Sequence, residues 1–390
     1  MGRLIWAVLI TASIFALFSC GEKITRPHEL PTGGTIGETT YVQLDPPWDD
    51  ANGYDFNNPH KLIVGYDTYI YVCDTDNNRI VRLDPHGAVV ATYDVFHPVG
   101  ITQDELMRLL VVDGMSRKVY KINVGPGGSG QATICYFDTM ITDPDDPDTT
   151  IHTDIMAESL LIDGTEVFTD IANAPGYIKR YYVATTSPDI ARSGKIVVFH
   201  NSIDLGQDTD SLLHTKYLVQ GDTAHNPIIV NGTGLGSTNH PTSILAFRRN
   251  SRDYLLITQD SSSFRTQLLA WNNNTYYKLG WYATAISPGA DNDMYSSNFF
   301  SSPACGAIDS SGNMYVVDKY SGIENGALKF DPTGKLKETW GPPGAGDSTG
   351  QMMIPAGIAY DNFASRRTVY IADTGNNRIL RFKLSTDLEQ

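Results

Sequence analysis

The stretch YIADTGNNRILRF, Tyr370–Phe382, decides the fold because a near copy, YVCDTDNNRIVRL, Tyr71–Leu83, lies close to the start of the chain. Eight of the thirteen positions are identical, and most of the apolar differences exchange like for like. Each copy contains two short runs of strand-forming residues, separated by an Asn pair that tolerates the left-handed backbone of a tight turn. Each copy therefore predicts a β-hairpin.

The two ends of each predicted turn carry opposite charges. An Asp and an Arg stand five residues apart in both copies, as Asp74 with Arg79 and as Asp373 with Arg378. We expect both couples to form structural ion pairs across the turn. The acidic, Asn-rich turn is also similar to a fragment of a calcium loop, but it lacks the later Gly and the bidentate Glu of that motif.

Weaker copies of the strand, turn, strand pattern fill the sequence between the two phrases, so that six hairpins result. Most of them follow a short strand that begins at a proline, and we expect these proline-led strands to be the inner strands of repeated sheets. The weaker hairpins lie at 109–123, 181–199, 254–271 and 314–331. The proline-led segments read NPHKLIV, HPVGIT, HPTSILAF, SPACGAID and IPAGIAYD.

Together the two elements resemble the NHL repeat, a family of β-propeller blades with the pattern Pro, Gly-Ile, Tyr-Val-x-Asp, Asn-x-Arg-Ile and Phe-Asp. The recognisable copies cover a little over a third of the chain and match best at 59–96 and 355–384. The resemblance implies an all-β fold, a six-bladed β-propeller of NHL-type blades. The segment between Asp113 and Asp318 would then hold two blades with long insertions. Five or seven blades are the alternatives.

A ring of four-stranded sheets must close, because otherwise its first and last blades expose unpaired edges. The last blade has only three strands of its own, whereas TYVQLDPPW, Thr40–Trp48, reads as a strand without a blade. We expect residues 40–48 to complete the final blade, so that the propeller domain spans residues 40–390.

The first nineteen residues predict export of the chain. Arg3 precedes an apolar run too short to span a bilayer comfortably, and the sequence LFSC ends at Cys20. This pattern resembles a bacterial lipoprotein signal, which implies a signal peptide at residues 1–19, a lipid on Cys20 and a tether at residues 20–39. By the same resemblance the protein is lipid-anchored in the cell envelope, and Gly21 favours the outer membrane where a bacterium has two. An ordinary signal peptide or an N-terminal anchor helix is the alternative.

The formal net charge of -15 disfavours two classes of partner. Phosphate backbones and anionic lipid surfaces carry the same sign, so we expect no nucleic-acid binding and membrane contact through the N-terminal lipid only. The remaining cysteines, Cys73, Cys135 and Cys305, show neither a disulfide framework nor a zinc-ligand spacing.

Four histidines are the candidate site residues. His60 follows a proline, His97 and His240 each precede one, and His152 is expected to head the third blade. Since the inner strands of a propeller begin at one mouth of the central channel, these histidines are candidates for a binding rim. Imidazoles from three blades also make His60, His97 and His240 candidates for binding zinc.

The NHL family includes a zinc-dependent lyase that acts on hydroxyglycine-type substrates, and its metal histidines lie in Pro-His motifs of three blades. Only His60 matches that motif in this chain. His97 and His240 are displaced from it by two positions, and the corresponding sites of blades five and six are Ala304 and Ala356. The rim interpretation is therefore favoured over the zinc interpretation.

The acidic run DPDDPDTTIHTD at residues 143–154 offers carboxylates to calcium, but its prolines favour a solvated loop between blades two and three. No cofactor is predicted, and zinc and calcium stay open. The favoured function is a lipid-anchored binding or scaffold module for a protein, peptide or glycan. The alternative is a metal-dependent lyase or lactonase-like enzyme with its site at the channel mouth.

Overall fold

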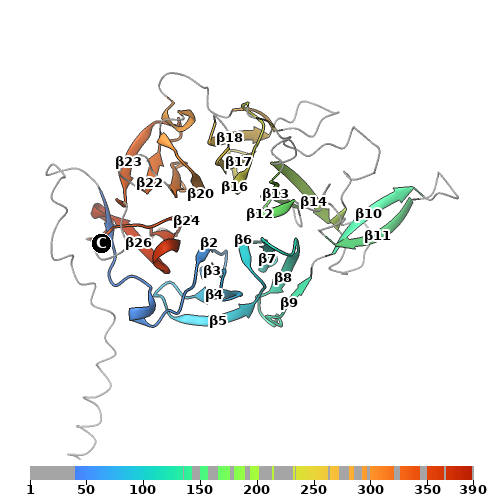
Figure 1. The fold of residues 1–390 in the computed structure, drawn as a ribbon, viewed down its shortest axis with the longest axis horizontal. Coiled ribbons are helices and arrows are strands. Elements are labelled where there is room, and N and C mark those ends of the chain that lie inside the picture. The colour runs from blue at the N-terminus through green and yellow to red at the C-terminus, as the bar shows by residue number, and fades with distance from the viewer. Residues whose placement is uncertain are drawn as a thin grey trace, which may run out of the picture.

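The computed structural model describes residues 40–388 apart from 135, 143–149, 157–165, 176–179, 189–193, 202–212, 215–231, 233, 262–263, 272–280, 285–291, 297–298, 320–325, 343–348 and 364–365. The predicted signal peptide, Cys20 and the tether thus lie outside the described residues. The strands form six sheets arranged in a ring, which is the six-bladed β-propeller expected from the repeats (Figure 1). Among the described residues, no helix has the length and apolar character needed to span a bilayer.

Five of the six blades have four strands each. Blade 1 contains β2 (Pro59–Val64), β3 (Ile70–Asp74), β4 (Arg79–Leu83) and β5 (Val89–Asp94). Blade 2 contains β6 (Pro98–Gln103), β7 (Arg108–Asp113), β8 (Val119–Asn123) and β9 (Ala132–Ile134). Blade 4 contains β16 (Pro241–Arg249), β17 (Arg252–Gln259), β18 (Thr266–Trp271) and β19 (Trp281–Thr284). Blade 5 contains β20 (Pro303–Ile308), β21 (Met314–Asp318), β22 (Ala327–Phe330) and β23 (Leu336–Trp340). Blade 6 contains β24 (Pro355–Tyr360), β25 (Val369–Asp373), β26 (Arg378–Leu384) and β1 (Tyr41–Gln43).

Blade 3 has six strands, because a hairpin is added at its outer side. Its inner part contains β12 (Val167–Asn173), β13 (Arg180–Thr186) and β14 (Lys195–Asn201), and its outer part contains β15 (Leu213–His214), β10 (Tyr136–Thr142) and β11 (Thr150–Met156). His152 lies on β11 at the outermost edge, so it does not head the inner strand as expected (Figure 1). Residues 150–154 of the acidic run belong to β11 rather than to a loop, and 143–149 lie outside the described residues.

Both copies of the repeated phrase form hairpins. The Nε atom of Arg79 lies 2.6 Å from Oδ2 of Asp74, and that of Arg378 lies 2.7 Å from Oδ2 of Asp373. The second Asn of each turn has a positive φ, 53° in the first copy and 51° in the second. This is the left-handed conformation for which an Asn is suited.

The N-terminal strand closes the ring. β1 pairs antiparallel with β26 and completes blade 6, as the fold required. It is shorter than the expected segment because two prolines follow it and cannot donate to the ladder, and Trp48 then returns to β26 through one bridge to Ile379. Tyr41 also stacks on Trp340 of blade 5, with ring centroids 4.4 Å apart.

The hydrophobic core lies between neighbouring blades, because each sheet buries its faces against the next sheets round the ring. Trp48, Leu62, Val72 and Tyr370, for example, pack together between blades 6 and 1. Similar clusters join blades 1 and 2, 3 and 4, 4 and 5, and 5 and 6. The inner strands β2, β6, β12, β16, β20 and β24 are therefore held at fixed places round the axis of the ring (Figure 1).

Candidate binding channel

Two chambers lie in the channel, one at each end of the inner strands. The upper chamber has a volume of about 260 Å³ and is lined by residues at the beginnings of the strands, among them His60 and His240. The lower chamber has a volume of about 440 Å³ and is lined by residues nearer their ends, among them Gln103 and Asn173. His60 lines the upper chamber, whereas Lys61, the next residue, lines the lower one.

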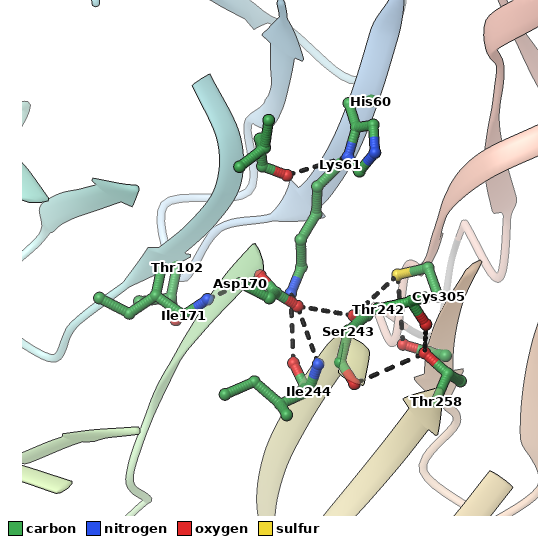
Figure 2. A network of polar contacts seen from close by, with 12 residues as sticks. His60, Lys61, Thr102, Asp170, Ile171, Thr242, Ser243, Ile244, Thr258 and Cys305 are labelled. Carbon is green, nitrogen blue, oxygen red and sulfur yellow. Dashed lines mark hydrogen bonds and ion pairs between the residues drawn. The ribbon is translucent and has the colours of Figure 1, made fainter. Parts of the chain in front are cut away.

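A buried ion pair lies between the two chambers (Figure 2). Lys61 reaches from β2 to Asp170 of β12, and its Nζ atom also donates to the carbonyl oxygen of Ile244 on β16, at 3.2 Å. Oδ2 of Asp170 accepts further bonds from Oγ of Ser243 at 2.6 Å and from the backbone N–H of Ile244 at 2.9 Å. Its Oδ1 atom accepts from the backbone N–H of Ile171 at 2.7 Å. The carboxylate is thus fully engaged by one cation and three hydrogen-bond donors.

The inner strands approach each other closely at this level because two of them carry glycine. A Cβ atom on Gly100 of β6 would lie 2.7 Å from Cα of Asp170, and one on Gly357 of β24 would lie 2.2 Å from the carbonyl oxygen of His60. Both distances are shorter than nonbonded contacts allow. Glycine at these two positions therefore permits the spacing at which Lys61 spans the channel.

Sequence reasoning missed the ion pair. Lys61 stands two residues after the leading proline of its strand, and Gly100, Ser243 and Gly357 hold the same position in theirs. The repeat therefore predicts that these four residues lie at the same depth of the channel. Asp170 carries no such signal, because β12 has no leading proline.

The upper chamber contains a small group of ionisable side chains. Nδ1 of His60 lies 3.0 Å from the carbonyl oxygen of Val99, and because a carbonyl only accepts, Nδ1 carries the proton. Burial, helped by the nearby Lys319, lowers the pKa of His60 to about 3, so the ring is neutral. Burial also lowers the pKa of Lys319, while Asp260 acts in the opposite direction. Nδ1 of His240 lies 3.9 Å from Oδ1 of Asp260.

The structure brings together only part of the predicted histidine set. His60 and His240 line the same chamber. His97 lies at its edge, near enough to contribute to the lowered pKa of His60, but it does not line the chamber. His152 belongs to the outer edge of blade 3.

The donor set in the channel does not fit a metal ion. Within the described residues, no three His, Cys, Asp or Glu side chains gather closely enough to hold one. Asp170 is already neutralised by Lys61, and Lys319 places a further amine in the upper chamber. Zinc sites need three or four N, S or carboxylate ligands, and calcium sites need six or more oxygens.

No protein-family model matches the chain, and no curated protein matches its sequence. Several solved structures share its fold. A gluconolactonase from Xanthomonas campestris is 13% identical, with a TM-score of 0.51, and the match covers 90% of this chain and 99% of that one. A protein of unknown function from Bacteroides thetaiotaomicron is 12% identical, with a TM-score of 0.52, over 89% and 77% of the two chains. A luciferin-regenerating enzyme is 11% identical, with a TM-score of 0.51, over 89% and 95%.

At such low sequence identities the similarity shows the fold alone, and any function must be argued from the residues of the site. The chain has a six-bladed β-propeller fold with gluconolactonase-like structures among its neighbours.

Proposed function

We propose that the protein is a lipid-anchored, extracytoplasmic propeller of the NHL type that binds a protein, peptide or glycan at the upper mouth of its channel. One observation carries the choice of binding over catalysis: the carboxylate buried among the inner strands, Asp170, is saturated by Lys61 and by backbone and hydroxyl donors. A metal-dependent hydrolase or lyase would need free ligands at such a place.

The rim of the upper mouth supports docking of a partner. Phe96 and Met115 are exposed there by 49% and 61%, although large apolar side chains are usually buried. Their loops are joined by a hydrogen bond of 3.2 Å from the backbone N–H of Gly114 to the carbonyl oxygen of His97. Aromatic and methionine side chains beside a chamber that holds Lys319 suit a partner with an apolar body and an acceptor or acidic tip.

The direction of β1 supports an outward-facing upper mouth. β26 begins at Arg378, beside the upper mouth, and Tyr41 pairs with Leu384 at its other end. A tether that enters at Thr40 therefore joins the lower side of the ring. The twenty residues 20–39 would reach at most roughly 70 Å when extended. A lipid on Cys20 would hold the lower side towards the membrane.

Metal analysis tests the choice between binding and catalysis. We expect the purified protein to contain well below one equivalent of zinc or calcium, and we expect EDTA to leave its melting temperature unchanged. The outcome that would contradict binding is a protein that contains one equivalent of either ion, hydrolyses lactones, and loses both the ion and the activity when EDTA is added. That outcome would favour the metal-dependent lyase or lactonase-like alternative.

The anchor is tested separately with Cys20→Ala. The variant should take up no labelled fatty acid and should leave the membrane fraction, because one cysteine is the lipid acceptor in the proposal. Cys73→Ala is the control, since that thiol is buried and should not affect labelling. Equal labelling of wild type and Cys20→Ala would contradict the anchor.

A further inference from the structure

Two buried amide side chains in the lower chamber have atoms without a hydrogen-bond partner. Gln103 at the end of β6 is 4% exposed, and Asn173 at the end of β12 is 7% exposed. The Nε2 atom of Gln103 makes no hydrogen bond. The Asn173 amide faces the Tyr66 hydroxyl, and a hydrogen bond between these two side chains opposes the rise that burial causes in the pKa of Tyr66, so at most one end of the amide is engaged. Buried polar groups in folded proteins are nearly always paired, so these atoms point to a missing partner.

The two amides are held in place by the fold. Oε1 of Gln103 accepts from the backbone N–H of Tyr66 at 2.6 Å, which leaves only its Nε2 donors free. The backbone N–H of Asn173 donates to Oγ1 of Thr102 at 3.0 Å and ties β12 to β6. Since the Tyr66 hydroxyl engages at most one end of the Asn173 amide, the other end has no partner whichever way the O and N atoms are assigned. The chamber thus offers free donors and an acceptor from adjacent blades.

The charge of the chamber favours a neutral ligand. Its charged lining residues are Lys61 and Arg248. Each of them is engaged with a carboxylate, Lys61 with Asp170 and Arg248 with Asp253. None of the described residues that line the chamber is an Asp or a Glu. A ligand with a full charge, including either end of a peptide, would therefore enter without a free counter-ion and would lose hydration without compensation.

The size and the walls favour a compact ligand with both polar edges and apolar faces. The volume of about 440 Å³ lies in the range of small-molecule sites. The Lys61–Asp170 pair lies at its inner limit, and Tyr66, Phe247 and Tyr360 contribute aromatic surface. A sugar ring combines hydroxyl groups that donate and accept with C–H faces that pack against apolar walls.

From these features we propose that the lower chamber is a binding site for a neutral sugar of one or two rings, with Gln103 and Asn173 bonded to its hydroxyl groups. This site is separate from the upper mouth and does not depend on the function proposed for it.

Saturation-transfer NMR on the purified protein tests the ligand class. The probes are glucose, galactose, mannose, N-acetylglucosamine, maltose and cellobiose, with glucuronate and glucosamine as charged analogues of the same size. We expect transfer to at least one neutral sugar and at least tenfold weaker binding of both charged analogues. Absence of transfer to every neutral sugar, or tighter binding of either charged analogue, would overturn the proposal.

Matched variants test the site. Asn173→Leu and Gln103→Leu should each weaken binding of the neutral sugar at least tenfold, whereas Gln131→Leu, the same change at an exposed position of blade 2, should bind as wild type. Because Asn173→Leu removes a buried amide that is only partly hydrogen-bonded, it should change the melting temperature little. It therefore keeps the test decisive even if Gln103→Leu disturbs the Tyr66 loop. Wild-type affinity in Asn173→Leu would overturn the site.

Discussion

His60 lies in the upper chamber, where burial and the neighbouring Lys319, Lys61 and His97 lower its pKa to about 3. In the unfolded chain a histidine titrates near 6.5. Below that pH the unfolded state binds a proton that the folded state does not, so the free energy of unfolding falls by up to about 1.4 kcal/mol for each pH unit down to about pH 3.

His60→Gln should therefore flatten the acid side of the stability profile. Chemical denaturation at pH 7 and pH 5 measures the difference, and His86→Gln, a change of an exposed histidine, is the control that should keep the wild-type slope. Identical slopes in wild type and His60→Gln would show that the His60 ring is protonated in the folded state at pH 5.

Burial also shifts the pKa of Asp373, a carboxylate in the last hairpin of the chain. It is fully buried, and it accepts from Nε of Arg378 at 2.7 Å and from the backbone N–H of Met353 at 2.6 Å. Burial nevertheless raises the pKa of Asp373, which means that the ion pair does not fully offset the loss of hydration. The pair therefore fixes the turn rather than adding much net stability.

Asp373→Ala should lower the free energy of unfolding by about 3 kcal/mol, because it leaves the guanidinium of Arg378 buried without its carboxylate. The double variant Asp373→Leu with Arg378→Leu should recover part of that loss, since it removes both charges. Urea denaturation of the two variants measures the coupling. Additive losses would contradict a direct interaction between the two side chains.

At the scale of elements, the close packing of the inner strands against one another depends on glycine positions. Gly357 of β24 faces the backbone of β2, and an added Cβ would lie 2.2 Å from the carbonyl oxygen of His60. Gly357→Ala should lower the free energy of unfolding by about 2 kcal/mol through overpacking. Gly234→Ala, where the nearest atom lies 3.9 Å away, should have little effect. Equal melting temperatures for the two variants would show that β24 and β2 can move apart enough to accommodate the added methyl group at no cost in stability.

The elements were predictable from the sequence where the signal is local. In the two well-matched blades the proline-led strand, the Asn turn and the paired Asp and Arg lie close together in the chain, at 59–83 and 355–382, and four weaker hairpins between them brought the count to six blades. Blade 3 could not be delimited, because β12 lacks the proline and its added hairpin has no counterpart elsewhere.

The channel was less predictable because its contacts are not local. Lys61 and Asp170 are 109 residues apart in the chain, and only closure of the ring brings them together. Gln103 and Asn173 stand at strand ends where no motif marks them. The proline-flanked histidines gave a partial signal, because His60 and His240 line one chamber and His97 does not line it. His152, which has no neighbouring proline, lies on β11 at the outer edge of blade 3.

At the scale of the whole molecule, stability depends on joining the two ends of the chain. β1 covers the edge of β26, Tyr41 packs against blade 5, and Trp48, 2% exposed, fills the cluster between blades 6 and 1. The segment that closes the ring therefore contacts three blades at once. An open ring would expose both the edge of β26 and the apolar faces beside it.

Two truncations test this closure. Deleting residues 21–38 should leave the melting temperature unchanged, because β1 and Trp48 remain. Deleting residues 21–48 removes both, and since loss of a buried aromatic side chain alone costs about 3 to 5 kcal/mol, the melting temperature should fall by roughly 10 °C or more, with aggregation through the free edge of β26. Scanning calorimetry and light scattering of the two proteins measure the difference. If both truncated proteins melt together and stay monomeric, the N-terminal strand does not hold the ring closed, and the interfaces between blades must do so alone.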